Sequence, residues 1–369
     1  DVFRSGGSKS KFTISCWLKR CKSGGYDFLL GRSGEFGVYV TSSDKLHIDL
    51  YSQGGNTWAV ICESQAVLRD FSAWYHIVVT LDTSAGTTNA DRIKFWLNGV
   101  QQTFNFTVYW GGLITGDARA LNDNASHSIG SRNGSYYGNS YLAEYYFIDG
   151  QALAPTDFGE YDSDNVWQPI EYVGTYGTNG VKLNFSDNSS NSALGTDSSG
   201  NGNDWTVNNL SVAAGAGNDS LVDSPSQIAD QTDTGVGGEV VGNYATLNPL
   251  KSTADLSNGN LTISPVNSHS NSYATLGVNT GKYYWEITRP SYSGNLGSIG
   301  IHGSTSASEN YGTSWAAPAS NSDQKVYYIN SSAAGLIYNS PAAVVFTISD
   351  SSTPTLPTGW NSDAGTYMF

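Results

Sequence analysis

The sequence is short of charge, and above all of positive charge. Only 14% of its 369 residues are charged, and 18 Lys and Arg face 32 Asp and Glu, which leaves a formal net charge of −14. Nucleic-acid binding depends on clustered Lys and Arg that neutralise phosphates. The nearest approach to such a cluster is Lys19-Arg20-Cys21-Lys22, a pattern typical of a solvated strand end. The composition therefore argues against a nucleic-acid partner and indicates an acidic surface.

Cysteine and long apolar runs are also scarce. The three cysteines, Cys16, Cys21 and Cys62, are too few, and odd in number, for a disulfide framework. Cys16 alternates with apolar neighbours and is expected to pack inward as a small hydrophobe, with a Cys16–Cys21 disulfide as the alternative. No apolar run approaches the ~20 residues that a membrane span needs, so none is expected. Because the sequence starts at Asp1 and its only methionine is Met368, a leading segment stays open.

Helical periodicity is missing as well. No window keeps an apolar stripe at a period near 3.6 residues, while Gly, Ser, Asn, Thr and Tyr dominate the composition. Such a composition suits short strands joined by tight turns. We predict an all-β chain of antiparallel jelly-roll or β-sandwich domains joined by an Asn/Gly/Ser-rich connector. The first domain is expected at 1–160, a loop-rich connector with short strands at 161–242, and a second β-sandwich at 243–369.

The first domain contains a series of short strands separated by turn residues. Alternating or continuous apolar residues predict strands at 12–19, 26–30, 36–41, 45–51, 58–63, 74–82, 92–97 and 141–148. Asn98-Gly99 predicts a hairpin, because both turn positions favour positive φ. The two-residue period of a strand directs one set of side chains to the core: Leu46, Ile48, Leu50, Tyr75, Ile77, Val79, Leu81, Ile93, Phe95 and Leu97.

The same alternation puts a mixed set of aromatic and polar residues on the opposite face. These residues are Trp17, His47, Asp49, Tyr51, Trp74, His76, Lys94 and Trp96. An aromatic ring stacks on the apolar side of a pyranose, and polar neighbours hydrogen-bond its hydroxyls. We therefore predict that these residues form one glycan- or partner-binding face. The alternative is that another strand layer, domain or subunit covers them.

A run of Asp, Ser, Gly and Asn that starts at Asp197 is the best candidate for a metal site. Asp197, Ser199 and Asn201 place oxygen ligands at the first, third and fifth positions, and Gly202 follows at the sixth, as in a calcium loop. The twelfth position is Asn208 and lacks the bidentate Glu of that loop. The default interpretation is a turn capped by its own side chains, and structural calcium on the first three residues is the alternative prediction. No other cofactor is expected.

The sequence contains no convincing catalytic constellation. The Glu-x-Asp-x-x-Glu pattern of laminarinase-type glycosidases is missing. Glu144 and Asp149 are five residues apart, on opposite faces of a strand, and Glu160 and Asp162 fall in a predicted loop. The five histidines show no metal-ligand spacing. A Ser-His-Asp triad stays open only because serine is abundant. We therefore expect no enzyme and assign no catalytic residues.

Several phrases of the sequence resemble known families. Seven of them begin at Phe12 (FTISCWLKR), Trp74 (WYHIVVTLD), Phe95 (FWLNG), Ala143 (AEYYFIDG), Tyr176 (YGTNG), Asp197 (DSSGNGNDW) and Asp219 (DSLVDSP). The first part resembles a laminin-G or concanavalin-like jelly roll, and the set in this order resembles virion appendage proteins of marine tailed phages. Residues 281–287 (GKYYWEI) and 297–301 (GSIGI) resemble the opening of a SPRY-like sandwich, which would be incomplete if it stops at Phe369.

The resemblance implies a role as well as a fold. It implies a non-catalytic virion protein, a tail or head fibre or a decoration protein, that binds host-surface polysaccharide or mediates particle contacts. Its location would be a surface-exposed appendage of the virion, with other virion proteins as partners and a homotrimer as the preferred self-association. A secreted bacterial carbohydrate-binding adhesin and a polysaccharide-degrading enzyme remain the alternatives.

Overall fold

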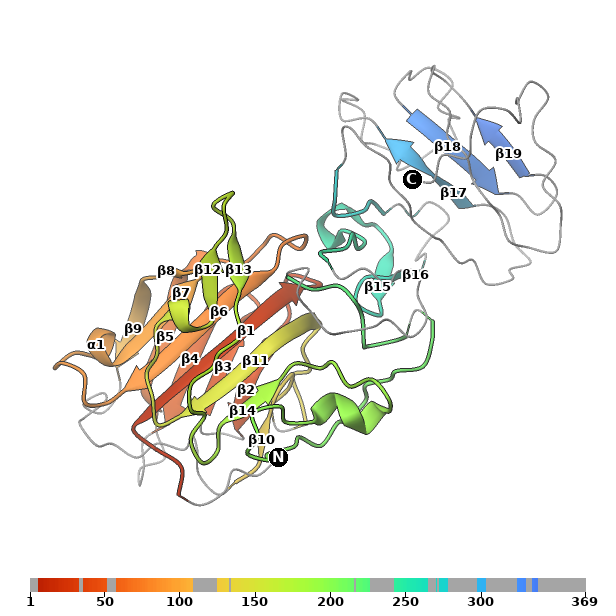
Figure 1. The fold of residues 1–369 in the computed structure, drawn as a ribbon. Helices are drawn as coiled ribbons and strands as arrows, with labels where there is room; N and C mark the ends of the chain where they lie inside the picture. The colour runs from red at the N-terminus through yellow and green to blue at the C-terminus, as the bar shows by residue number, and fades with distance from the viewer. Residues whose placement is uncertain are drawn as a thin grey trace. The chain divides into compact units, whose positions relative to one another are not determined.

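The chain folds into two compact units. The computed structural model (Figure 1) describes residues 6–32, 36–51, 58–108, 125–132, 134–215, 217–225, 242–264, 270, 272–277, 297–302, 324–329 and 334–337. The first unit comprises Asp1–Val266 and Ser272–Leu276, and the second comprises Asn267–Asn271 and Gly277–Phe369.

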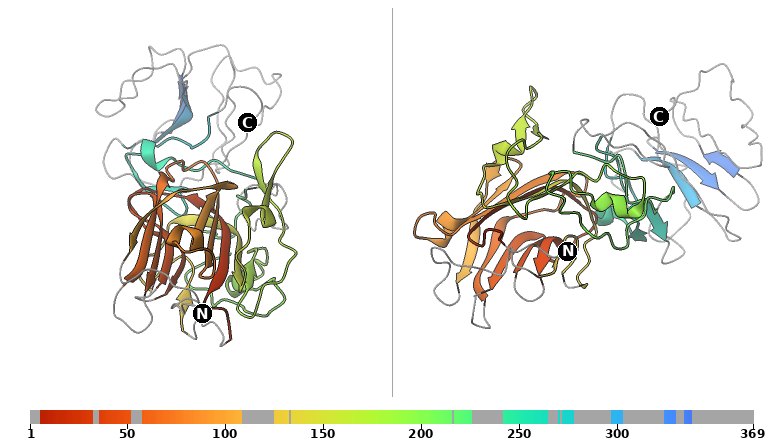
Figure 2. Two further views of the ribbon diagram at one scale, coloured as in Figure 1. Left: turned by 90° about the vertical axis from the view of Figure 1, so that its left-hand side faces the viewer. Right: turned by 60° about the horizontal axis from the view of Figure 1, so that its bottom comes forward.

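Two six-stranded antiparallel sheets face each other in the first unit (Figures 1 and 2). The first sheet has the order β14 (Val181–Leu183), β11 (Ser140–Asp149), β1 (Lys11–Arg20), β6 (Tyr75–Asp82), β7 (Ile93–Leu97) and β8 (Val100–Gln101). The second sheet has the order β10 (His127–Ser128), β2 (Asp27–Arg32), β3 (Phe36–Val40), β4 (Lys45–Tyr51), β5 (Trp58–Val67) and β9 (Phe104–Val108). The predicted all-β sandwich is confirmed, and the α-helix α1 spans only Asn89–Arg92.

The core lies between the two sheets, where the alternation of the sequence placed it. Nine of the ten residues expected to face inward are buried there, and Leu97 packs against them partly buried. Each fully buried aliphatic or aromatic side chain stabilises the fold by roughly 1.5–3 kcal/mol. Apolar burial between the sheets is therefore the main source of stability for the first unit.

All three cysteines are buried free thiols. Cys16 lies in the core, as predicted, and the alternative of a Cys16–Cys21 disulfide is wrong. Burial raises the pKa of the Cys16 thiol far above its ordinary value. Because the thiolate is the reactive form, this cysteine serves as packing only.

The predicted Asn98-Gly99 hairpin joins β7 to β8. Both residues have positive φ, 48° and 77°, and the flanking residues pair across the turn. Gly99 also lies against the ring of Trp167, where a Cβ would come within 2.6 Å of the ring. Glycine is thus required here both by the turn and by the close approach of a second segment.

Much of the segment expected to be a connector is built into the first unit. The hairpin of β12 (Gly159–Tyr161) and β13 (Trp167–Pro169) follows the 3-10 turn η1 (Pro155–Asp157) and projects from the sandwich (Figure 1). β14 extends the first sheet beside β11. A 3-10 turn, η2, covers Asn191–Gly195. Part of the expected connector, residues 226–241, lies outside the described residues.

The later part of the chain contains shorter pieces of sheet. In the first unit, η3 (Pro249–Lys251) precedes a hairpin of β15 (Asp255–Ser257) and β16 (Thr262–Ser264). The second unit has a three-stranded antiparallel sheet of β17 (Gly297–His302), β18 (Gln324–Ile329) and β19 (Ala334–Ile337). Residues 281–287, which resemble part of a SPRY-like sandwich, lie outside the described residues. In the described part of the chain, no helix is both long and apolar enough to cross a bilayer.

Candidate functional site

The eight residues expected to form one binding face lie on two different sheets. The first sheet and the residue just before β6 hold five of them: Trp17, Trp74, His76, Lys94 and Trp96. β4, in the second sheet, holds His47, Asp49 and Tyr51, and of these the side chain of Tyr51 lies outside the described part. The prediction of a single shared face is therefore wrong, because strands that look alike in sequence join different sheets.

On the first sheet, the predicted face is covered by the chain itself. Trp17, Trp74 and Trp167 form a buried cluster, and Trp167 comes from the β12–β13 hairpin. The rings of Trp17 and His76 stack with centroids 4.9 Å apart, and Trp167 stacks beyond His76 at 6.0 Å. Further along, Lys94 and Trp96 are half-buried, and Trp96 packs against a second apolar cluster. The covering alternative is thus correct for this face.

The buried cluster also contains a Ser–His pair that could be mistaken for a catalytic dyad. Ser15 Oγ lies 2.8 Å from His76 Nε2, while the indole N–H of Trp167 donates to His76 Nδ1 at 2.9 Å. Because Nδ1 accepts, the ring proton is on Nε2, and His76 donates to Ser15. Burial lowers the pKa of His76 to about 3. The pair cannot activate Ser15 as a nucleophile, since the imidazole lacks a free basic nitrogen facing it.

Three of the four acidic residues considered for catalysis have structural roles, and the fourth, Glu160, is exposed on β12. Asp149 accepts hydrogen bonds from two backbone amides far apart in sequence. Glu144 accepts the hydroxyl of Tyr146, and Asp162 caps the turn of the β12–β13 hairpin. Each of these three carboxylates accepts hydrogen bonds from the protein. A glycosidase needs a pair of carboxyl groups that can transfer protons to and from a sugar, and this arrangement does not suit that role.

The three residues expected to bind calcium lie together in one loop. The carboxylate of Asp197 accepts the backbone amides of Lys182, Ser199 and Asn203, and the Ser199 hydroxyl as well. Asn201 directs its amide group at the carbonyls of Gly177 and Gly180. N–H and O–H donors already surround the carboxylate of Asp197, as expected for a capped turn. A calcium site would need oxygen atoms turned toward a cation instead. Among the described residues no group of three or more His, Cys, Asp or Glu is arranged for a metal, and the calcium stays a prediction.

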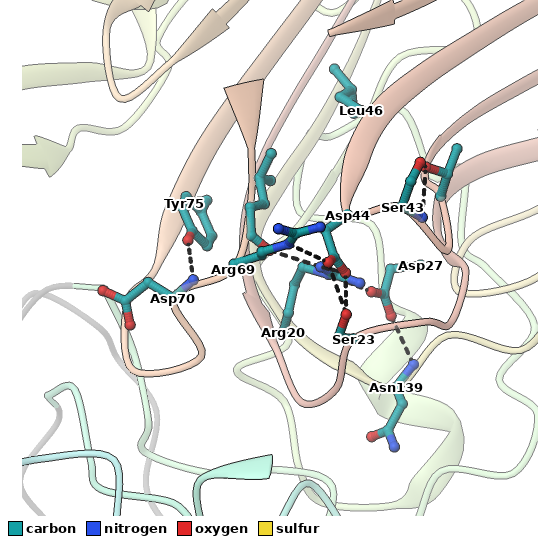
Figure 3. Close-up of polar contacts among 12 residues, drawn as sticks. Arg20, Ser23, Asp27, Ser43, Asp44, Leu46, Arg69, Asp70, Tyr75 and Asn139 are labelled. Atoms are coloured by element: carbon teal, nitrogen blue, oxygen red, sulfur yellow. Dashed lines mark hydrogen bonds and ion pairs between the residues drawn. The ribbon is translucent and has the colours of Figure 1, made fainter. Parts of the chain in front are cut away.

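A buried charged network closes one end of the sandwich (Figure 3). Arg20 pairs with Asp27 at 2.8 Å and with Asp44 at 2.9 Å, and it also donates to the carbonyl of Leu68 at 2.7 Å. Arg69 holds Asp44 from the solvent side at 2.7 Å. Burial pushes the pKa of Asp44 upward, but hydrogen bonds from Arg20, Arg69 and Ser23 outweigh it and lower that pKa. The network ties β1, β2, the turn before β4 and the segment after β5 together.

The outer face of the second sheet carries the best candidate site. Strand register there forms a row across four strands, in which Phe28 pairs with Tyr39, Tyr39 with His47, and His47 with Glu63. A bulge in β2 turns Phe28 outward while the two leucines after it face the core. We call Phe28, Tyr39 and His47, together with Tyr26 and Tyr136 beside them, the aromatic strip.

The rings of the aromatic strip are in contact with one another. Tyr26 and Tyr136 meet edge to face at 5.4 Å and 74°, and Tyr26 lies 6.0 Å from Tyr39. Phe28 and Tyr39 stack at 4.4 Å, and Tyr39 lies 4.9 Å from His47. Tyr136 and Tyr26 are 60% and 37% exposed, whereas Phe28 and Tyr39 are buried beneath them. The strip therefore presents two tyrosines to solvent on a rigid aromatic support.

Tyr136 is delivered by a loop that rests on the sheet, formed by residues 130–132 and 134–138 and named here the Arg132 loop. Gly31 lets it approach, since a Cβ there would come within 2.9 Å of the Ser131 carbonyl and 3.3 Å of Arg132 Cβ. Arg132 then reaches Asp49 at 2.9 Å, and its guanidinium lies 5.9 Å from the centre of the Phe28 ring. Tyr136 has a φ of 53°, a conformation unusual for a bulky residue.

Asp49 is buried beneath this loop. Its second carboxylate oxygen, Oδ1, has no hydrogen-bond partner among the described residues and lies where a Cβ on Gly37 would come within 2.7 Å. Burial raises the pKa of Asp49 to about 6, against the opposing effect of Arg132. Asp49 thus holds Arg132 in place and does not itself face the solvent.

The other end of the strip is polar. Lys45 pairs with Glu63 at 2.9 Å, and His47 Nδ1 lies 4.0 Å from the second oxygen of Glu63. Burial lowers the pKa of His47, so its imidazole is neutral at pH 7. The side chains of Lys45 and Glu63 are each about one-third exposed, so this end of the strip presents a paired cation and carboxylate to solvent.

Comparison with known proteins identifies the fold that carries this strip. Residues 4–156 match the family model described as the Concanavalin A-like lectin/glucanases superfamily. A concanavalin-like jelly-roll fold is therefore present in the first unit. The match covers less than half of the chain, and no curated protein matches it.

Solved structures resemble the chain only distantly. A Bacteroides ovatus protein, provisionally described as carbohydrate binding, is 16% identical with a TM-score of 0.39, over 56% of this chain and 54% of its own length. A Ruminococcus gnavus sialidase CBM40 module bound to α2,3 sialyllactose is 19% identical with a TM-score of 0.25, over 36% and 73%. A heptameric pentraxin from Limulus polyphemus is 14% identical with a TM-score of 0.25, over 40% and 67%. The chain thus spans about half of the first of these proteins.

Some residues of the candidate site were expected from the sequence, and the others were not. His47 and Asp49 were expected and lie in it. Tyr39 could have been found, because the inward residues of β3 leave Gly37 and Tyr39 on the outer face. Arg132 and Tyr136 carry no local signal, since they reach the strip through a contact between segments about a hundred residues apart in sequence.

Proposed function

We propose that the jelly roll of the first unit binds glycan without catalysis, through the aromatic strip on the outer face of the second sheet. The observation that carries the proposal is the exposed corner of Tyr26 and Tyr136, which meet edge to face beside the row of rings that ends at His47 and Glu63. The family description, which names lectins as well as glucanases, supports binding of a carbohydrate. The structural use of the candidate catalytic carboxylates supports a binding role over hydrolysis.

The chemistry of the corner suits a sugar ring. Tyrosine faces contact the C–H side of a pyranose, while their hydroxyls and the neighbouring polar groups exchange hydrogen bonds with its hydroxyls. Glu63 and the neutral His47 lie at one end of the strip, and Arg132 lies at the other. Asp49 acts as a positioning residue, because it holds Arg132 and the loop that carries Tyr136.

Removing either exposed tyrosine should weaken glycan binding by about tenfold, the effect expected for truncating an aromatic anchor at the centre of a site. A glycan array on the full chain identifies the ligand, and calorimetry measures Tyr26→Ala and Tyr136→Ala. Tyr161→Ala is the matched control, since Tyr161 is an exposed tyrosine on the β12–β13 hairpin. Equal affinity in the three variants and the wild type would refute the proposed site.

Glycan affinity should fall about fivefold as the pH drops from 7.5 to 5, because Asp49 gains a proton near pH 6 and the charge that holds Arg132 is lost. The contribution of Asp49 to folding stability changes with pH in the opposite direction. The folded protein takes up this proton more readily than the unfolded chain, so Asp49 contributes more to the free energy of unfolding as the pH falls from about 6 to about 4. Asp49→Asn should bind weakly at every pH and flatten the profile; an unchanged profile would contradict the role given to Asp49.

The setting of this binding is part of the proposal. The resemblance of the sequence to appendage proteins of marine tailed phages supports a place on the virion surface, as a tail or head fibre or decoration protein. There the domain would contact host-surface polysaccharide, with other virion proteins and two further copies of the chain as partners. Electron microscopy of particles with antibody labelling tests the location, and light scattering tests the trimer. Unlabelled particles together with a monomeric protein would refute this setting.

A further inference from the structure

We propose that the aromatic strip selects an uncharged sugar and discriminates against carboxylated or sulfated glycans. The inference rests on the proposed glycan binding and concerns the chemical class of the ligand.

The charges beside the strip are paired within the protein. Arg132 is held by Asp49 at 2.9 Å, and Lys45 is held by Glu63 at 2.9 Å. These two cations and two carboxylates cancel, and His47 is neutral because burial lowers its pKa. A ligand at the tyrosine corner therefore meets polar groups whose charges are already balanced.

Recognition of an anionic sugar needs a cation that can turn to it, usually an Arg or Lys in a charge-assisted hydrogen bond. Here such a ligand would have to displace Asp49 from Arg132, or Glu63 from Lys45, and would then lie beside the displaced carboxylate. The formal net charge of −14 adds repulsion at longer range. A neutral sugar need not displace a paired carboxylate and is not repelled by the net charge. Its hydroxyls can donate to the carboxylates and accept from the cations while the ion pairs stay intact.

One cation lies near the tyrosine end of the strip. Lys22 is exposed and passes over Gly25, next to Tyr26, where a Cβ on Gly25 would lie 3.0 Å from Lys22 Cε. It lies on the turn between β1 and β2, outside the row of paired residues. A single solvated lysine adds little to binding, because surface ion pairs are weak and screened by salt.

The test compares matched neutral and charged probes on the full chain. The probes are galacto-, gluco- and manno-oligosaccharides, their uronic acid counterparts and their sulfated forms, measured at 20 mM and 500 mM salt. We expect the wild type to bind a neutral probe at least about tenfold more tightly than its charged counterpart, with an affinity that salt does not change. Glu63→Gln removes the carboxylate that pairs with Lys45. At low salt this variant should show a smaller ratio of neutral-probe to charged-probe affinity than the wild type.

The outcomes separate this inference from the proposed function. A preference for charged probes that weakens with salt would overturn the inference, and its loss in Lys22→Gln would assign the anion to that lysine. Equal binding of both classes, weakened alike by Tyr136→Ala, would also overturn it while leaving the glycan site intact. Binding of neither class would overturn the proposed function itself.

Discussion

Replacing Arg20 by methionine should lower the free energy of unfolding by about 3–5 kcal/mol, the cost typical of breaking a buried ion pair by removing one partner. The Arg20 side chain is fully buried and lies between Asp27 and Asp44, which are themselves buried (Figure 3). Without the guanidinium, Asp27 loses its charged donor and Asp44 keeps only the exposed Arg69 as a charged donor. Methionine retains most of the apolar volume, so the loss reports on charge more than on packing.

Calorimetric unfolding of the full chain at pH 7 measures the effect, and Arg69→Met is the matched control. Arg69 binds the same Asp44 but has a side chain that is 59% exposed, so its removal should cost less than about 1 kcal/mol. Removing the stranded charges together with their partner, as in Arg20→Met with Asp27→Asn and Asp44→Asn, should recover part of the loss. Equal small effects for Arg20 and Arg69 would contradict the role given to the network.

Truncating Trp17 to alanine should destabilise the first unit by about 3–5 kcal/mol and leave glycan affinity unchanged in the protein that remains folded. The indole is buried between Trp74 and the stack of His76 and Trp167, so its loss opens a large cavity. It lies on the sheet opposite to the aromatic strip. Trp17→Ala is therefore expected to lower stability without changing glycan affinity.

Chemical denaturation and calorimetry on the same samples distinguish the two effects of Trp17→Ala. Tyr136→Ala is the reciprocal variant, because an exposed ring contributes little to folding and is expected to change stability by less than about 1 kcal/mol. A Trp17 variant that keeps its stability but no longer binds glycan would restore the first sheet as the binding face.

The strands and their inward faces followed from the sequence because strand alternation is a local property. The residues of β4, β6 and β7 that point to the core were identified in this way, and the Asn98-Gly99 turn needed only its two residues. Sheet membership is not local. β1 pairs with β6 on one side and with β11 on the other, more than a hundred residues away. Outward residues of β1 and β4 therefore could not be assigned to different sheets in advance.

The candidate site was harder to predict than the fold for the same reason. His47 and Asp49 stood out because polar residues alternate with leucines in one strand. The contact of Arg132 with Asp49 depends on how a distant loop crosses the sheet, and the covering of Trp17 depends on the hairpin that carries Trp167. In the loop at Asp197 the local pattern was clear but ambiguous. The same spacing of oxygen-bearing side chains can cap a turn or bind a cation, and here Asp197 accepts backbone amides.

The Arg132 loop rests on Gly31 by backbone and is anchored by the pair of Arg132 with the buried Asp49 and by a backbone hydrogen bond from Gly130 to Phe28. The side chains of Tyr136 and Tyr137 are exposed, so changing these rings should cost the fold little. On the proposed binding role, exchange of the tip that carries Tyr136 should alter which sugar is accepted and leave the two sheets beneath it unchanged.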